Sequence, residues 1–479
     1  MAQAPIEGAA TMAAKWRSRC HWLIPLVGAW LWFCALSVQS QHQVANLENV
    51  ENYALAVFCQ LFYNWSENGL WAQTIHFGYV DSWMWSGHRT GILPLVGWIY
   101  GIDPGPEWLC RFQILLVSLG AIPAYGLGRI VIGRTLGGVA GMLLYLGYPP
   151  LAAIALQDYQ DLVVGLPLMM LAIWQSRRKK TWPFVITALL AMMAREELIP
   201  MVVLVGLAVP GSIRQRLSWA AKAGAVALLY SGALWLLGLS FSGYDNPMMS
   251  HTGDLFLQWP PQWSRTPDEF RNFYLPFLQP LHFLAVLSPA SLLPALGGMF
   301  FHLTAPAHGG VDAHWRGHIH HMAPVALFLI VATIDSVGLL VKASRRTGRW
   351  RTPLLAISGA AGLAVTITLA RPWMNYMGLS LQLWPTASVE RVPEWDLADM
   401  IPADAIAATD TWASLTIANR RQAYTYDESL RDKLPGAGIE ALEWILVNRK
   451  DRKWLKAATQ ATGAEIMGES QDYVLVKLR

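Results

Sequence analysis

The sequence has few charged residues for its length. Of the 479 residues, 14% are Asp, Glu, Lys or Arg, whereas a soluble domain typically contains about 25%. Hydrophobic residues make up 54% of the chain. This composition excludes a soluble globular fold for most of the chain, and it predicts a polytopic α-helical membrane protein.

Acidic residues are missing from every second connection between the apolar segments. All the charged residues of these connections are Lys or Arg, and the connections are 14–19, 129–134, 176–180, 214–222 and 342–351. Short loops with this bias lie on the cytoplasmic side of membranes. The pattern therefore predicts a cytoplasmic N-terminus. Because the basic clusters are short and lie beside apolar segments, no nucleic-acid partner is expected.

Cysteine is also scarce. The four cysteines, Cys20, Cys34, Cys59 and Cys110, show neither paired spacing nor a metal-binding motif. A disulfide between Cys59 and Cys110 is one interpretation if both face an oxidising compartment, and free thiols are the favoured alternative.

The apolar segments predict ten or eleven transmembrane helices. The first, at about 22–38, follows basic residues and has no Ala-x-Ala cleavage site, which indicates a retained anchor rather than a signal peptide. The others are expected at 108–131, 135–156, 161–175, 182–195, 197–211, 218–240, 276–303, 323–341 and 352–370. Pro289 and Pro294 predict a break in the 276–303 segment, and broken helices of this kind line cavities.

Three regions are predicted from this pattern. They are a cytoplasmic N-terminus (1–21), a transmembrane domain (22–371) with a long first external loop (39–107), and an extracytoplasmic soluble domain (372–479). Within the last region, strands are expected at 405–408, 422–426, 441–447, near 465 and at 473–477, with helices at 393–400, 411–419 and 453–459. Strands that alternate with helices predict a small α/β domain with a partly parallel sheet.

Charged side chains between two apolar segments form a first candidate site. Arg195, Glu196 and Glu197 separate two such segments. One interpretation is a solvated external turn. The other is a half-buried cluster at the mouth of a cavity, with Arg195 available for a phosphate and a glutamate for a hydroxyl. Asp335 lies within a predicted span, where a helix-packing contact is favoured over a catalytic role.

The first external loop offers further ligand-binding side chains. Its beginning, 49–69, has the apolar spacing of an amphipathic helix, with Glu51, Gln60, Asn64 and Glu67 between the apolar positions. His88 and Arg89 precede another apolar helix, where a cation can bind a lipid phosphate. A purely interfacial helix and an exposed or structural His-Arg pair are the alternatives.

Metal binding is considered at two places. Asp158 and Asp161 are three residues apart at a helix start, where their oxygens can coordinate a divalent cation, although capping of the helix is the favoured alternative. Half of the 12 histidines lie close together, at His302, His308, His314, His318, His320 and His321. The spacing of His314 and His318 suits a transition metal on a helix. A loop that titrates near neutral pH, or that contacts a phosphate, is the alternative.

Several of these motifs occur in order along the chain. They are Phe58, Gln60, Asn64 and Gly69; His88 followed by ILPLVGWIYGIDPGP; Gln113 with AIPAY (121–125); YPP (148–150) with DYQ (158–160); Arg195-Glu196-Glu197; LSP (287–289); and His320-His321. Over roughly 50–345 the chain resembles a family of bacterial predicted membrane proteins, domain of unknown function 2079. That family is similar to the GT-C glycosyltransferases, which take sugars from polyprenyl-phosphate donors on the outer face of the membrane.

The resemblance implies a GT-C-like fold in the bacterial inner membrane, with membrane lipid and a polyprenyl-phosphate-linked sugar as partners. It implies an Asp or Glu of the first external loop as the catalytic base, for which Glu51 is the candidate, with Glu196 and Glu197 as further candidates. Substrate and phosphate binding are assigned to His88, Arg89, Arg195, Gln60, His320 and His321. No cofactor is certain, and a divalent cation would bind at the sites named above.

Two departures from the family pattern bear on catalysis. Ala54 stands where the family tends to have Asp, and Asp158-Tyr159-Gln160 stands where it has a triplet similar to DFH. Glu51 lies within one helical turn of Ala54 and can replace the missing acid. A non-catalytic subunit or scaffold that binds protein partners in a membrane complex is therefore the alternative function. A transporter ranks third, because the polar residues gather at one membrane face and no internal repeat is visible.

Overall fold

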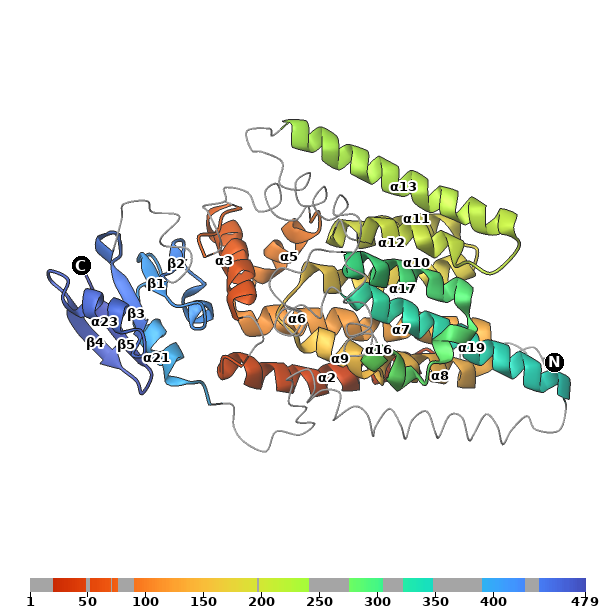
Figure 1. The fold of residues 1–479 in the computed structure, drawn as a ribbon, viewed down its shortest axis with the longest axis horizontal. Coiled ribbons are helices and arrows are strands. Elements are labelled where there is room, and N and C mark those ends of the chain that lie inside the picture. The colour runs from red at the N-terminus through yellow and green to blue at the C-terminus, as the bar shows by residue number, and fades with distance from the viewer. Residues whose placement is uncertain are drawn as a thin grey trace, which may run out of the picture.

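The computed structural model describes residues 20–48, 52–69, 71–75, 90–195, 198–240, 275–304, 322–347, 390–426 and 439–479. They form a helical bundle and, at one end of it, a small α/β domain (Figure 1). The predicted fold class is therefore confirmed. The expected span at 352–370 lies outside the described residues.

The helices of the bundle follow the predicted segments closely. They are α2 (Leu23–Ala45), α3 (Asn52–Asn68), α5 (Leu93–Tyr100), α6 (Pro106–Leu119), α7 (Ala121–Gly128), η1 (Arg129–Gly133), α8 (Arg134–Leu146), α9 (Pro149–Leu156), α10 (Asp161–Arg177), α11 (Thr181–Ala194), α12 (Leu198–Leu207), α13 (Ile213–Ser240), α16 (Leu275–Leu278), α17 (Pro289–Thr304) and α19 (Ala323–Thr347). Within the described parts of the chain, four helical stretches are long and apolar enough to cross a membrane: Leu23–Ala45, Pro106–Leu146, Ile213–Leu234 and Ala323–Ser344.

The longest of these stretches contains a reversal of the chain. Pro106–Leu146 has 41 residues, and a straight helix of that length would extend about 60 Å, twice the roughly 30 Å of a hydrocarbon core. Gly133 and Arg134 have positive φ angles of 106° and 57°, and they turn the chain from η1 into α8. The basic connection predicted at 129–134 is therefore the turn between two antiparallel helical segments.

Glycines allow these two segments to approach closely. A Cβ atom added to Gly128 would lie 2.2 Å from the carbonyl oxygen of Gly137, and one added to Gly141 would lie 2.5 Å from the carbonyl oxygen of Ala124. Small residues at such positions let helix backbones pack directly against each other, which is a common way to join helices in lipid.

The predicted break in the 276–303 segment is confirmed at Pro289. His282 and Phe283 adopt the left-handed conformation between two short 3-10 turns, η4 (Gln279–Leu281) and η5 (Leu284–Leu287). Pro289 then begins α17, where its missing N–H costs nothing. Pro294 lies inside α17 and does not end it.

The α/β domain contains one five-stranded sheet of order β2-β1-β3-β5-β4. The strands are β1 (Ala407–Thr409), β2 (Ala423–Thr425), β3 (Trp444–Asn448), β4 (Glu465–Glu469) and β5 (Tyr473–Lys477). β2, β1 and β3 are parallel, whereas β5 is antiparallel to β3 and β4. The prediction of a partly parallel sheet is therefore confirmed.

The two faces of the sheet enter different cores. Alternate side chains point to opposite faces of a strand, and those of Ala407, Leu446 and Leu475 share a core with α3. The other face packs against α23 (Arg452–Thr459). α3 and α5 lie at the end of the bundle nearest this domain (Figure 1). The α/β domain is therefore docked on the bundle through one face.

Some expectations about single elements were wrong or incomplete. The helix expected at 411–419 is only a short 3-10 turn, η7 (Ser414–Ile417), whereas the helix expected at 393–400 is confirmed as α21 (Pro393–Asp399). Cys59 and Cys110 are both free and buried, so the disulfide considered for them is not formed.

Gly128→Ala is expected to destabilise the protein by about 1 to 3 kcal/mol, because the new methyl group would clash with backbone atoms of α8 rather than with a flexible side chain. Gly224→Ala is the matched control, since nothing lies within 4 Å of a Cβ atom there. Alanine at this helical position should be neutral or stabilising by roughly 0.5 to 1 kcal/mol. Thermal unfolding of the purified proteins in detergent measures both effects, and equal midpoints would contradict the close approach.

Candidate functional site

A buried ion pair lies at the open end of the α10–α11 hairpin. Asp161 is the first residue of α10, and Arg195 directly follows α11. Arg195 Nη1 donates to Asp161 Oδ1 over 3.0 Å, and the two side chains are 4% and 0% exposed. Arg195 is therefore not part of a solvated turn, which was one of the two interpretations of its sequence motif.

A third segment joins this ion pair. Thr90 Oγ1 donates to Asp161 Oδ2 over 2.5 Å, and the amide of Leu162 donates to Asp161 Oδ1 over 2.8 Å. The amide of Ile92 also bonds to the carbonyl of Met193 in the last turn of α11. We call Thr90, Asp161 and Arg195 the hairpin-end cluster. Thr90 follows His88-Arg89 in the sequence, Asp161 ends the polar segment 157–161, and Arg195 precedes Glu196-Glu197. The cluster therefore joins three polar motifs that are far apart in the sequence.

The loop before α10 is held by Gln113 on α6. Its Nε2 donates to the carbonyls of Ala155 and Gln157, and its Oε1 accepts from the amide of Gln160 over 2.7 Å. Asp158, in the same loop, is buried with 3% exposure. Gln113 therefore holds the loop 157–160, which leads into Asp161, in a defined conformation.

The described residues do not favour a cation at Asp161. Both of its oxygens already accept hydrogen bonds, one of them from the guanidinium of Arg195. Nowhere in the described ranges do three or more His, Cys, Asp or Glu side chains gather in a way that could hold a metal. The cation at Asp158 and Asp161 stays a prediction.

A second buried ion pair lies at the opposite end of α10. Arg177 Nη2 donates to Asp335 Oδ2 over 2.7 Å and to Ser291 Oγ over 3.2 Å, and Ser291 Oγ also bonds to Asp335. Asp335 lies on α19 and Ser291 on α17. The favoured interpretation of Asp335, a contact that packs helices together, agrees with this arrangement.

Gln60 on α3 has a place that its sequence pattern did not indicate. It is fully buried, its Nε2 donates to Thr74 Oγ1 over 2.9 Å and to the carbonyl of Arg420, and its Oε1 accepts from the amides of Thr74 and Ile75. Thr74 Oγ1 in turn donates to the carbonyl of Ala423 on β2 over 2.6 Å. Gln60 thus fastens segment 71–75 to the edge of the sheet.

Two further contacts connect the same parts. Asn64 Nδ2 donates to the carbonyl of Ala72, and Tyr100 at the end of α5 donates to Asn419 Oδ1 over 2.7 Å. Sequence reasoning missed Thr74 and Thr90 entirely, because a single threonine carries no periodicity or motif. The position of Thr90 beside His88-Arg89 was the one available signal.

The remaining predicted site residues lie outside the described residues. They are Glu51, His88, Arg89, Glu196, Glu197, His314, His318, His320 and His321. Their assigned roles stay predictions.

Asp161→Asn is expected to lower the free energy of unfolding by about 3 to 5 kcal/mol, because it leaves the buried guanidinium of Arg195 without its counter-ion. The matched control is Glu107→Gln, which breaks a pair of the same N···O distance, 3.0 Å, with the half-exposed Arg391. That change should cost no more than about 1 kcal/mol. Equal losses in thermal unfolding would show that burial does not set the strength of the hairpin-end pair.

Gln60→Leu is expected to loosen the α/β domain from the bundle, since it leaves the buried amides of Thr74 and Ile75 unbonded at a cost of about 1 to 3 kcal/mol each. Because the variant removes the acceptor that these two amides share, limited proteolysis should cut between the bundle and the domain faster than in the unmodified protein. Gln215→Leu, on the exposed start of α13, is the control and should leave the cleavage rate unchanged. An unchanged rate for both variants would contradict the fastening role of Gln60.

The comparisons with known proteins bear on the family and the fold. The model of the family described as "Predicted membrane protein (DUF2079)" matches residues 47–252. No curated protein matches the sequence. Among solved structures, ArnT from Cupriavidus metallidurans bound to undecaprenyl phosphate is similar, with 10% identity, a TM-score of 0.59, and coverage of 93% of this chain and 97% of ArnT.

Two further solved structures match the chain. ArnT in the apo state has 12% identity, a TM-score of 0.55 and the same coverage. The archaeal oligosaccharyltransferase AglB from Archaeoglobus fulgidus has 12% identity and covers 94% of this chain and 72% of its own, with a TM-score of 0.39 that is too low to indicate a shared overall fold. The resemblance of residues 47–252 to the DUF2079 family is confirmed, and the chain is a membrane protein with a GT-C-like fold.

Proposed function

We propose that the protein is a glycosyltransferase that takes a sugar from a polyprenyl-phosphate carrier at the outer face of the membrane. The similar structure of ArnT was determined with undecaprenyl phosphate bound, which supports a lipid phosphate as the ligand class. The proposal further places the protein in the bacterial inner membrane, with the N-terminus in the cytoplasm and the α/β domain outside.

The hairpin-end cluster is the observation that carries the proposal. Thr90, Asp161 and Arg195 join the three motifs from which catalytic and phosphate-binding residues were predicted. Asp161 orients the guanidinium of Arg195, and a guanidinium held in place binds phosphate oxygens more strongly than one that must first be ordered. Arg89 and Glu196 are the chain neighbours of Thr90 and Arg195.

The topology of the hairpin also supports this assignment. The basic connection 176–180, which is expected in the cytoplasm, joins α10 and α11 at one end. Asp161 and Arg195 lie at the other end, about 24 Å away along a helix of 17 residues. The candidate site and the basic connection are therefore on opposite sides of the bundle.

The reaction assigns one task to each group. Glu51 takes the proton of an acceptor hydroxyl, whose oxygen attacks the anomeric carbon of the donor sugar. The bond between that carbon and the phosphate oxygen breaks, and the polyprenyl phosphate leaves with the electron pair. Arg89 and Arg195, together with His320 or His321, stabilise the negative charge of the departing phosphate. His88, Glu196 and Glu197 bind sugar hydroxyls, and Gln60 positions the docked domain.

Glu51→Gln is expected to reduce transfer by about 10² to 10⁴-fold, the usual contribution of a general base. The measurement is transfer from a panel of radiolabelled undecaprenyl-phosphate monosaccharides by the purified protein in nanodiscs. Glu48→Gln, an exposed acid three residues earlier, is the matched control and should retain full turnover. Unchanged turnover in the Glu51 variant would remove Glu51 from the mechanism.

A second measurement tests the function itself. Mass spectrometry of lipids that co-purify with the protein should detect polyprenyl phosphate, and Arg195→Ala should reduce the amount retained. A protein that carries no polyprenyl lipid, transfers no sugar, and purifies instead in a stable stoichiometric complex would favour the scaffold.

A further inference from the structure

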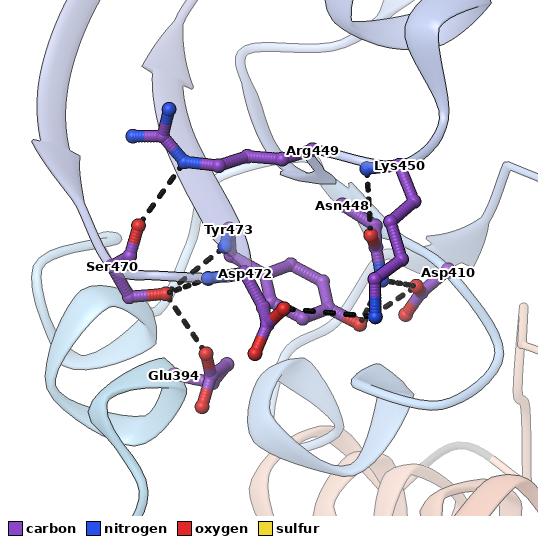
Figure 2. A network of polar contacts seen from close by, with 8 residues as sticks. All are labelled: Glu394, Asp410, Asn448, Arg449, Lys450, Ser470, Asp472 and Tyr473. Carbon is purple, nitrogen blue, oxygen red and sulfur yellow. Dashed lines mark hydrogen bonds and ion pairs between the residues drawn. The ribbon is translucent and has the colours of Figure 1, made fainter.

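A polar and aromatic cluster lies at the carboxyl ends of two parallel strands of the α/β domain. Asp410 follows the last residue of β1, and Asn448 is the last residue of β3. Both lie beside Tyr473, the first residue of β5 (Figure 2). We call these three residues and Trp412 the strand-end cluster.

Hydrogen bonds hold the inner part of this cluster. Tyr473 donates its hydroxyl to Asp410 Oδ2 over 2.7 Å, and Asn448 Nδ2 donates to the same oxygen over 3.3 Å and to the Tyr473 hydroxyl over 3.1 Å. Asp410 Oδ1 accepts from the amide of Ala413 over 2.9 Å. Burial and the neighbouring Asp410 carboxylate raise the pKa of Tyr473, so that its hydroxyl stays protonated and donates.

The place of the cluster in the sheet is one where α/β domains bind ligands. The strand order β2-β1-β3 puts the second and third strands on opposite sides of the first. η7 accordingly packs on one face of the sheet and α23 on the other. The chain directions therefore diverge beyond the carboxyl ends of β1 and β3, and such switch points form the usual ligand crevice of open parallel sheets.

Trp412 adds an exposed aromatic ring beside these strand ends. Its ring stacks on that of Tyr473, with centroids 5.9 Å apart and an interplanar angle of 18°. Tyr473 is buried, whereas Trp412 is 45% exposed. The hydrogen-bonded tyrosine thus supports the indole from beneath and holds it in a fixed orientation. Tying β1 to β3 accounts for the buried Asp410, Asn448 and Tyr473, and Trp412 adds an exposed indole beside them.

A donor and an acceptor lie near the tyrosine, since Asp472 precedes Tyr473 in the chain and pairs with Lys450. Lys450 and Asp472 are 85% and 52% exposed, and their charged atoms are 3.7 Å apart. Figure 2 shows the side chain of Lys450 reaching the carboxylate of Asp472. An exposed pair at this distance contributes little to stability, so it can open toward a ligand at small cost.

We propose that the strand-end cluster binds a pyranose ring of a carbohydrate. The C–H groups of one face of the ring, which carry partial positive charge, stack on the negative face of the Trp412 indole. Hydroxyl groups at the ring edge accept from the ammonium of Lys450 and donate to the carboxylate of Asp472. The pair is neutral overall, which favours an uncharged sugar over a phosphate. Sugar binding at the strand-end cluster is independent of the proposed transferase function, because it requires no transfer.

Saturation-transfer NMR on the full-length protein in nanodiscs tests this proposal. The probes are the methyl glycosides of glucose, mannose, galactose and N-acetylglucosamine. At least one should bind saturably, and Trp412→Ala should weaken its affinity by about tenfold. Trp182→Ala is the matched control, because it removes an indole that is 76% exposed at the start of α11. The Trp182→Ala variant should bind the methyl glycoside with the same affinity as the unmodified protein.

Further variants keep the test decisive if Trp412→Ala unfolds the domain. Lys450→Ala changes a side chain that is 85% exposed, so the domain should stay folded while the affinity falls several-fold. Trp412→Phe should recover part of the binding lost in Trp412→Ala. No saturable binding of any probe would overturn the proposal, as would equal affinities in the unmodified protein, the Lys450 variant and a folded Trp412 variant. Co-purification of polyprenyl phosphate is measured separately and does not depend on these outcomes.

Discussion

A charge buried in an apolar bundle requires a partner of opposite sign, and the position of α10 follows from this requirement. Its first residue, Asp161, pairs with Arg195 after α11, and its last residue, Arg177, pairs with Asp335 on α19. The acid is at the positive end of the helix dipole and the base at the negative end. The two pairs therefore select the neighbours of α10 at each end, where apolar contacts alone would allow it to slide or rotate.

The hairpin-end cluster and the α/β domain are connected through few elements. Thr90 bonds to Asp161 and is followed by α5, whose last residue, Tyr100, bonds to Asn419 in the domain. α5 packs on α3, and α3 carries Gln60, which fastens segment 71–75 to β2. The candidate site and the domain thus depend on the same short helices. A shift of the domain would therefore move α5 and change the position of Thr90 at the hairpin end.

The helices and strands could be predicted well from the sequence, because the pattern of apolar and polar residues within each segment determines them. Helical α10 was expected at 161–175 and extends to Arg177, since an apolar run flanked by charge has a defined length. The pairing of Asp161 with Arg195 was not predictable, because both appeared only as separate polar motifs. Gln60 was read as a ligand-binding residue for the same reason: its partners, Thr74 and the Arg420 carbonyl, are 14 and 360 residues away. The helix at 411–419 was overestimated because Asp410 and the docking on α3 restrict it to one turn.

The bonds of Thr74 to Ala423 have a consequence for synthesis of the chain. The two residues are 349 positions apart, so at typical rates of translation the segment 71–75 is made about 20 to 70 s before its partner strand. During that interval its buried donors and acceptors must be satisfied by water or by another protein. The surface of segment 71–75 that binds β2 therefore stays open while all the described helices of the bundle are synthesised. A chain shortened before β2 would keep that surface exposed permanently.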